Sequence, residues 1–457
     1  MHDLNPPQRD AARHVDGPLL VLAGAGSGKT RVITRKIAYL IEECGLSARN
    51  IAAVTFTNKA AREMKSRVAE MMASRGSSAR GLMVSTFHNL GLNILRKEFS
   101  HLGYRSGFSI FDQQDSLAVL RDLMGRDFAA DSEHAEQCQW QISEWKNQMI
   151  MPEQAMMIVE DEQQAAAAKV YQRYVAALHA YNAVDFDDLI LKPVLLFRDF
   201  PDVLKKWQAR IHYLLVDEYQ DTNGCQYELV KQLVGIREAL TVVGDDDQSV
   251  YSWRGARPEN LVQLQQDFPR LKLIKLEQNY RSMGRILRVA NQLISNNPHI
   301  FEKKLWSARG EGDAIRVIAC RDEFHESEKV VSELLYHKLK HNAEFKDYAI
   351  LYRSNHQSRP IEQILREHDV PYILTGGTSF FSRVEVKDIM AYLRLLANQD
   401  DDNAFLRVIN TPRRGIGATT LQALGNYAAE RKTSMFGACF EMGLADRISA
   451  KAMGHLD

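Results

Sequence analysis

The stretch 18-PLLVLAGAGSGKTR-31 decides the fold class of this chain of 457 residues. Its apolar start is typical of a buried parallel strand, and isoleucines and leucines recur at helical spacing from Lys29 to Glu43. A glycine-rich turn between such a strand and such a helix can hold phosphate on backbone N–H groups at the helix N-terminus. The pattern departs from G-x-x-x-x-G-K-[ST] only at its first position, which is Ala23. The alternative is an ordinary glycine turn.

Apolar runs and helical patterns alternate around this stretch. Further strands are predicted at 50–56, 82–87, 211–216, 240–243 and 273–276, with a helix at 58–72. This alternation predicts an α/β fold with a doubly wound parallel sheet. The residues from about 89 to 200 are rich in Gln, Ala, Met and Trp and lack strong strand patterns, so we expect a helical insertion there.

A second, shorter strand–helix series follows. Strands are predicted at 314–319, 348–352 and 372–375, and helices at 324–339 and 357–367. After Gly376 and Gly377 the pattern is helical to the last residue. A sheet built from these three runs needs more strands than the sequence supplies.

Composition excludes several classes of protein. Hydrophobic residues make up 45% of the chain, and 58 basic residues balance 58 acidic ones, so neither a disordered chain nor a globally basic nucleic-acid binder is expected. The N-terminus has no apolar signal region, and no apolar run approaches the ~20 residues that span a bilayer. The five cysteines lack metal or redox spacing, which favours a reduced cytosolic protein.

Carboxylates complete the predicted phosphate site. Lys29 would contact the β and γ phosphates of a nucleotide, and the Thr30 hydroxyl would bind Mg²⁺. Asp217 and Glu218 follow another apolar strand, where Asp217 would hold Mg²⁺ through its outer shell and Glu218 would orient or deprotonate water. The alternative, two solvated carboxylates at a strand end, becomes less attractive beside Lys29 and Thr30. Together these residues predict an NTPase.

Two further polar residues fall where they could sense the γ-phosphate. Gln248 follows the strand at 240–243, and Arg281 begins the region between the two strand–helix series. An arginine there could stabilise transition-state charge. The alternative for the segment that contains Gln248 is an ordinary turn after a strand, and the alternative for Arg281 is a surface arginine.

Aromatic residues follow several of the same strands. Phe56, His88, Tyr251 and Trp253 are expected at the carboxyl edge of the sheet, with Asn58 and Arg254 beside them. Rings at that edge could stack on unpaired bases at ~1–3 kcal/mol per base. Core packing is the alternative for any one ring, but several at one edge favour a nucleic-acid site.

The order of motifs resembles that of superfamily 1 DNA helicases of the UvrD/Rep family. The motifs are AGAGSGKT, TFTNKAAREM, STFH, DFDDLI, LLVDEYQDTN, VGDDDQSVYSWRGA and LEQNYRS. The resemblance covers essentially the whole chain. It implies an ATP-driven motor that moves 3′ to 5′ on single-stranded DNA, unwinds 3′-tailed or forked duplexes and serves replication or its restart in the bacterial cytoplasm.

The resemblance also assigns roles to individual residues. Gln8 would read the adenine edge, Tyr280 would stack on adenine, and Arg31 would lie near the nucleotide. The nucleotide-binding set also includes Gly24, Ala25, Gly26, Ser27, Gly28, Lys29, Thr30 and Arg281, and the hydrolytic set comprises Lys29, Glu218, Gln248 and Arg281. Single-strand contacts are expected from Phe56, Asn58, His88, Phe186, Tyr251, Trp253, Arg254, Arg353, Asn355 and Arg359.

By the same resemblance, two RecA-like lobes each carry a mainly helical insertion. The expected limits are 1–88 and 201–276 for the first lobe, 89–200 for its insertion, 277–375 for the start of the second lobe, and 376–457 for the start of its insertion. The second lobe and its insertion are expected to be incomplete at Asp457, which would remove a further arginine finger and weaken the coupling of hydrolysis to movement.

Three alternatives remain beside the helicase. The chain could be a helicase subunit of a RecB- or AddA-like helicase–nuclease, a single-strand-binding module without catalysis, or a small-molecule P-loop kinase. The kinase is disfavoured by the Tyr251–Arg254 stretch. The expected partners are DNA and replisome or restart proteins, with no membrane, and the expected state is a monomer, with dimerisation on DNA as the alternative.

Overall fold

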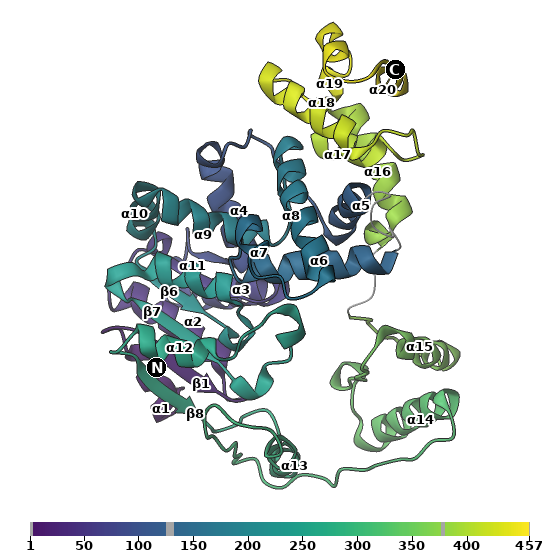
Figure 1. Ribbon diagram of the computed structural model, residues 1–457. Helices are drawn as coiled ribbons and strands as arrows, with labels where there is room; N and C mark the ends of the chain where they lie inside the picture. Colours follow the sequence, from purple (N-terminus) through teal and green to yellow (C-terminus); the bar gives the residue numbers. More distant parts are fainter. Residues whose placement is uncertain (1–2, 125–131, 376–379, 457) are drawn as a thin grey trace. The chain divides into compact units, whose positions relative to one another are not determined.

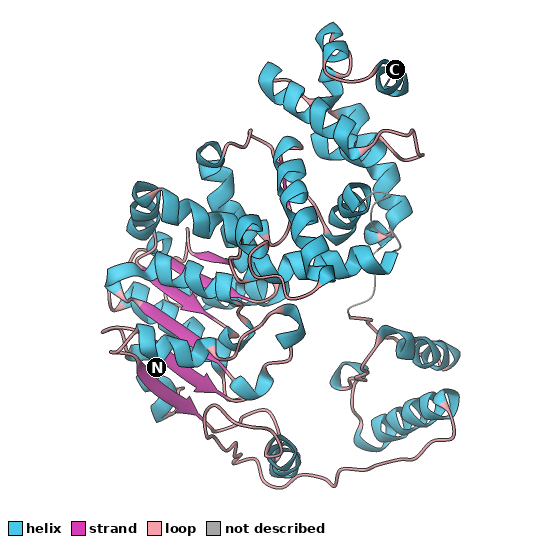
Figure 2. Cartoon of the chain, in the orientation of Figure 1, coloured by secondary structure: helices cyan, strands magenta, loops and turns pink. Residues whose placement is uncertain are grey.

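A computed structural model describes residues 3–124, 132–375 and 380–456. Its chain forms two compact units, one of residues 1–313 and 394–457 and the other of residues 314–393. Figure 1 gives the order of elements, and Figure 2 shows that the larger strands gather in one sheet.

Six parallel strands form the central sheet of the first unit. Its order is β3-β2-β6-β7-β1-β8, formed by Met83–Thr86, Ile51–Thr55, Tyr213–Val216, Leu240–Gly244, Leu19–Ala23 and Lys272–Leu276. In register, Leu20 pairs with Val242 on one side and Leu273 on the other. All six strands lie within or at the edge of the runs predicted for them, so the parallel α/β sheet is confirmed.

Helices cover both faces of this sheet. On one face, alternate strand residues pack with α1 (Pro6–Arg13), α2 (Lys29–Glu42) and α3 (Asn58–Ala73). The opposite face packs with α4 (Phe87–Glu98), α9 (Asp188–Asp199), α10 (Pro201–Arg210), α11 (Gly224–Val234) and α12 (Asn260–Asp267). Because both faces are buried, the strands are apolar throughout, which made them easy to predict.

The rest of the first unit is mainly helical. It contains α5 (Gln113–Met124), α6 (Ser132–Asn147), α7 (Pro152–Ala155), α8 (Glu162–Ala180), α13 (Gly284–Ile294), α17 (Asp402–Val408), α18 (Ala418–Arg431), α19 (Met435–Ala438) and α20 (Ala450–Leu456). One hydrophobic core joins α5, α6 and α8 to α17–α19. The helical character expected after residue 376 is confirmed for the described residues.

The residues between 89 and 200 are mainly helical, as expected, but they also contain two short strands that were not predicted. Ser109–Ile110 (β4) and Ala183–Val184 (β5) form a separate two-stranded parallel sheet. Each strand has only two residues, which is too short to produce a recognisable alternation. The predicted limits of the insertion stay predictions, although α9, which lies inside them, contributes to the core of the main sheet.

The second unit departs from its predicted strands. Its helices α14 (Glu323–His341) and α15 (Ser358–Glu367) match the predicted ones, and α16 (Val384–Ala397) continues into the first unit. None of its described residues is in a strand, so the strands predicted at 314–319, 348–352 and 372–375 are not formed. Val317, Leu351 and Ile373 are almost fully exposed. A strand forms only where a neighbour satisfies its backbone, and the described chain offers these runs none.

Candidate nucleotide site and nucleic-acid groove

The phosphate loop, Gly24–Thr30, connects β1 to α2. Gly26 and Gly28 have φ angles of +71° and +91°, which residues with a Cβ rarely adopt. The Ser27 hydroxyl donates to the Gly24 carbonyl over 2.7 Å, and α2 begins at Lys29. A Cβ on Gly26 would also lie 2.5 Å from Asn279 Nδ2. The glycine spacing therefore serves both the tight turn and the close approach of a distant segment.

Lys29 and Glu218 form an ion pair at the mouth of this loop. The distance from Lys29 Nζ to Glu218 Oε2 is 2.7 Å, and the lysine side chain is only 11% exposed. Glu218 follows β6 with a left-handed backbone, φ +51° and ψ 47°, a conformation that costs a non-glycine residue about 1–3 kcal/mol. This geometry aims the carboxylate at the phosphate loop.

Asp217 lies buried next to Glu218. Its side chain accepts the Glu218 N–H over 3.1 Å. Burial, reinforced by the negative charge of Glu218, raises the pKa of Asp217 to about 6. Two further buried oxygens, Thr55 Oγ1 and Asp221 Oδ1, have no hydrogen-bond partner among the described residues.

The oxygens of these residues are of the kind that Mg²⁺ prefers. Carboxylate and hydroxyl oxygens are hard ligands, and Thr30 adds a hydroxyl in the first turn of α2. The pKa of Asp217 is raised by burial and by Glu218 although Lys29 acts to lower it, so the charge of Lys29 does not fully compensate this carboxylate. The residues present therefore fit the ion.

Three residues are expected around the adenine or near the nucleotide, and their contacts in the structure differ. Gln8 is buried and donates from Nε2 to the Ser27 carbonyl over 2.8 Å. The Tyr280 hydroxyl forms hydrogen bonds with the side chains of Gln278 and Asn5. The Tyr280 backbone N–H donates to the Gly26 carbonyl over 2.9 Å. Arg31 is exposed and pairs with Asp3 over 2.8 Å. Gln8 and Tyr280 thus lie directly at the phosphate loop.

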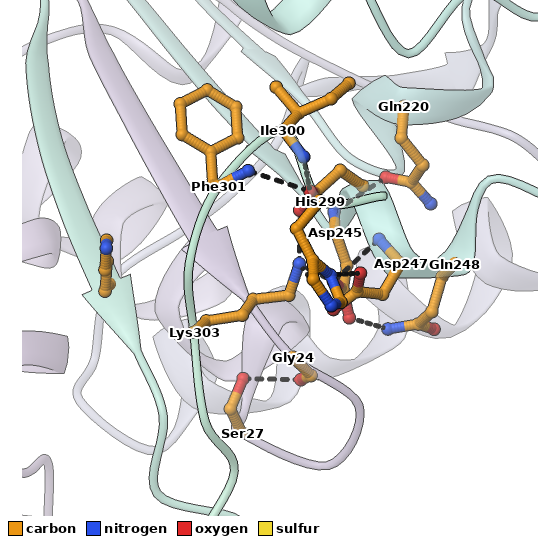
Figure 3. A network of polar contacts seen from close by, with 12 residues as sticks. Gly24, Ser27, Gln220, Asp245, Asp247, Gln248, His299, Ile300, Phe301 and Lys303 are labelled. Atoms are coloured by element: carbon orange, nitrogen blue, oxygen red, sulfur yellow. Dashed lines mark hydrogen bonds and ion pairs between the residues drawn. The ribbon is translucent and has the colours of Figure 1, made fainter. Parts of the chain in front are cut away.

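The two predicted γ-phosphate sensors differ in their surroundings. The Gln248 amide donates to Asp245 Oδ2, within an acidic turn that also binds Lys303 (Figure 3). Arg281 is exposed, and its Cβ lies 2.8 Å from the position that a Cβ on Gly26 would occupy. The structure therefore places Arg281 at the loop and ties Gln248 to its own turn.

An aromatic groove lies at the carboxyl ends of β2, β3 and β7. The rings of Phe56 and Tyr251 are stacked with centroids 4.8 Å apart, and Trp253 lies 6.5 Å from Tyr251. His88 and Phe186 meet edge to face at 6.3 Å. All five line one groove of about 880 Å³. Trp253 is 63% exposed, so much of its side chain faces solvent at this groove.

The remaining predicted DNA contacts are placed less uniformly. Asn58 is exposed at the start of α3 and accepts a hydrogen bond from Asn89 over 2.8 Å. The side chain of Arg254 lies outside the described part of the structure. Arg353, Asn355 and Arg359 belong to the second unit, where they are exposed around the start of α15. Their roles stay predictions.

Several polar residues of the site were not predicted. Asn279 donates to the Ala25 carbonyl over 2.6 Å and accepts the N–H groups of Arg281 and Ser282. Gln220 donates to Glu218 Oε2 over 2.9 Å. Asn279 lies in the motif LEQNYRS and Gln220 in LLVDEYQDTN, so membership of a motif could have identified both residues. Lys303 lies in none of the motifs, and no sequence signal indicated that it contacts this site.

This fold and site define the class of P-loop nucleotide-binding proteins with a parallel doubly wound sheet. Residues 4–269 match the UvrD/REP helicase N-terminal domain, and residues 274–437 match the UvrD-like helicase C-terminal domain. The chain belongs to the UvrD/Rep helicase family.

Individual relatives agree with this assignment. The chain is 57% identical over 448 residues to the ATP-dependent DNA helicase Rep of Escherichia coli, covering 98% of this chain and 66% of the relative. It is 55% identical to the ATP-dependent DNA helicase Rep of Salmonella typhimurium, covering 99% of this chain and 67% of the relative. It is 43% identical to the ATP-dependent DNA helicase PcrA of Bacillus subtilis, covering 99% of this chain and 61% of the relative. The chain spans about two thirds of the length of these relatives.

Proposed function

We propose that this protein is an ATP-dependent DNA helicase that moves 3′ to 5′ along single-stranded DNA and acts in replication or its restart. Family membership supports the reaction class, and the names of the relatives support ATP and DNA as substrates. Within the described residues no helix is long and apolar enough to cross a membrane.

One observation carries the proposal: nucleotide residues and aromatic rings share one edge of one sheet. The phosphate loop follows β1, Asp217 follows β6 and Gln248 follows β7, while Phe56 follows β2. Tyr251 lies only three residues beyond Gln248. A rearrangement at a bound γ-phosphate could therefore reach the stacked rings through a short segment of chain.

The ion pair between Lys29 and Glu218 suggests how hydrolysis is controlled. A bound triphosphate would attract the Lys29 ammonium and separate it from Glu218. The freed carboxylate could then accept a proton from a water molecule or orient it for attack. In this scheme Glu218 becomes an effective base only when nucleotide is present.

Further residues have defined roles in this proposal. Thr30 and Asp217 would hold Mg²⁺, which supplies charge neutralisation at the phosphates. Arg281 would stabilise negative charge on the transferred phosphoryl group, while Gln8 and Tyr280 would orient the base. The aromatic groove would bind successive unpaired bases by stacking. Arg254 and the exposed polar residues of the second unit would add contacts to the strand.

The proposal also includes architecture and setting. The second unit would be part of a second RecA-like lobe, and ATP hydrolysis would drive movement by closing the cleft between lobes. The protein would act as a monomer, or as a dimer on DNA, in the bacterial cytoplasm, where replisome or restart proteins could recruit it to forks.

ATP turnover by the 457-residue chain, measured with and without a single-stranded oligonucleotide, tests the proposal. We expect turnover that the oligonucleotide stimulates, followed by strand separation on a 3′-tailed duplex. Oligonucleotide binding without turnover would instead identify a binding module. Unwinding that requires a 5′ tail would contradict the proposed polarity.

A further inference from the structure

Lys303 lies among three carboxylates at the end of β7. Its Nζ is 2.7 Å from Asp245 Oδ1 and 2.9 Å from Asp247 Oδ2, and it also pairs with Asp246. The lysine side chain is only 4% exposed, although it comes from the segment that follows α13. Figure 3 shows its ammonium directed into the acidic turn.

The segment around Lys303 is anchored to the same turn by other contacts. The N–H groups of Ile300 and Phe301 donate to Asp246 Oδ2 over 3.2 and 3.1 Å. His299 Nδ1 lies 3.0 Å from Asp247 Oδ1. Burial alone would lower the pKa of Lys303, but its carboxylate partners raise that pKa above the usual value. The lysine therefore stays charged, and the acidic turn has its counter-ion inside the chain.

A continuous series of polar contacts leads from Lys303 to the phosphate site. The Asp245 N–H donates to Gln220 Oε1 over 3.0 Å, and Gln220 Nε2 donates to Glu218 Oε2 over 2.9 Å. Glu218 Oε2 is the atom that pairs with Lys29. Gln220 is almost completely buried, and its Nε2 also donates to Asp221 Oδ2 over 3.5 Å, so these partners hold its amide in one orientation.

Close packing makes this connection rigid. A Cβ on Gly244 would lie 3.0 Å from Gln220 Oε1. The backbone of β7 therefore packs directly against the Gln220 side chain. Asp245 also holds the Gln248 amide through its second carboxylate oxygen. Asp245 therefore holds the predicted γ-phosphate sensor with its carboxylate and, through its backbone N–H, holds the glutamine that bonds to the predicted base.

We propose that Lys303 is a positioning residue for ATP hydrolysis, acting on Glu218 and Gln248 through Asp245 and Gln220. Without the ammonium, three neighbouring carboxylates would repel one another, and this repulsion would act on the Asp245 carboxylate that holds Gln248 and on the turn whose Asp245 N–H holds Gln220. The inference deepens the proposed function and rests on it.

The first test compares Lys303→Met with Lys304→Met in the full chain. Lys304 is the adjacent lysine and its side chain is exposed, so its substitution changes the net charge equally without touching the acidic turn. We expect Lys303→Met to lower kcat of strand-stimulated ATP turnover by roughly 10- to 100-fold, with KM for ATP changed less than about threefold. Equal kcat values for the two variants would overturn the inference.

A second variant separates positioning from general loss of structure. Gln220→Met breaks the same series of contacts one step nearer to Glu218. Because Lys303 acts on Glu218 through Gln220, the double variant should lose less kcat than the product of the two single losses. Losses that multiply would show independent effects and overturn the inference.

Hydrogen–deuterium exchange provides a readout that does not require turnover. In Lys303→Met, amides in peptides covering residues 213–222 and 244–251 should exchange faster than in Lys304→Met, while those of β2 stay unchanged. Faster exchange confined to 244–251 would overturn the connection to Glu218. A wild-type chain without strand-stimulated turnover would contradict the proposed function, and the exchange result would still decide whether Lys303 positions this site.

Discussion

Lys29 and Trp253 show how differently the two sites at the carboxyl edge of the sheet are built. Lys29 is nearly buried and is held by an ion pair inside a loop that depends on left-handed glycines. Trp253 is mostly exposed, beside rings that provide further stacking surfaces. A polar site depends on one arrangement of charges, whereas a groove of rings divides affinity among several contacts. Substitutions should therefore be severe at the first site and graded at the second.

The largest effect is expected for Lys29→Ala. Removing the cation that contacts the β and γ phosphates should lower ATP turnover by about 10²–10³-fold, the range seen when a preorganised electrostatic contact is lost. Single-strand affinity should stay measurable, because the groove does not contain Lys29. Steady-state turnover and oligonucleotide titration check both statements. Retained turnover would contradict the assignment of the phosphate site and remove the contrast between the two sites.

Asp217→Asn should raise the stability of the fold while it lowers ATP turnover. The folded-state pKa of Asp217 is about 6, above its model-peptide value, so the folded protein binds the proton more tightly than the unfolded chain. Stability from this residue is therefore greatest below about pH 4 and is lost as pH rises through 6. At pH 7.5 the Asn variant should be more stable by about 2–3 kcal/mol and should lose turnover.

Denaturant unfolding at pH 7.5 and pH 4.5 checks this prediction. The gain should shrink at the lower pH, where wild-type Asp217 is mostly protonated in the folded state. A gain of equal size at both pH values would show that the buried charge is not its cause.

Trp253→Ala should have a graded effect. Loss of one stacking surface should weaken affinity for an oligo-dT strand by on the order of 1–3 kcal/mol, while turnover at saturating strand should persist. Fluorescence anisotropy with a labelled oligonucleotide measures the change. If the variant and the parent bind equally well, Trp253 does not stack on bases.

The smallest effect is expected for Asn58→Ala. Asn58 is exposed and its described hydrogen bond is to Asn89, another exposed residue. Its loss should change strand affinity by less than about 0.5 kcal/mol, as is usual for exposed surface positions. The same anisotropy titration measures it. A loss as large as that of Trp253→Ala would mean that a polar contact beside the groove contributes as much as one of its rings.

Many parts of the fold and site could be predicted because their signals are local. Parallel strands buried on both faces are continuous apolar runs, and Gly26, Gly28 and Lys29 stand at the spacing that a phosphate loop requires. The two-residue strands at Ser109–Ile110 and Ala183–Val184 were missed because alternation needs more length. The apolar runs of the second unit were assigned to strands wrongly, since apolar sequence indicates burial potential but not the presence of a neighbour.

The sequence by itself determined the class of site, its loop and the carboxylates at the strand ends, because strand, turn and helix preferences act between near neighbours. Only the tertiary structure decided which distant groups complete that site. Asn279 reaches the Ala25 carbonyl across 254 positions and Lys303 reaches Asp246 across 57. Contacts of this kind depend on how the chain returns to the sheet edge, and residue spacing does not record that path.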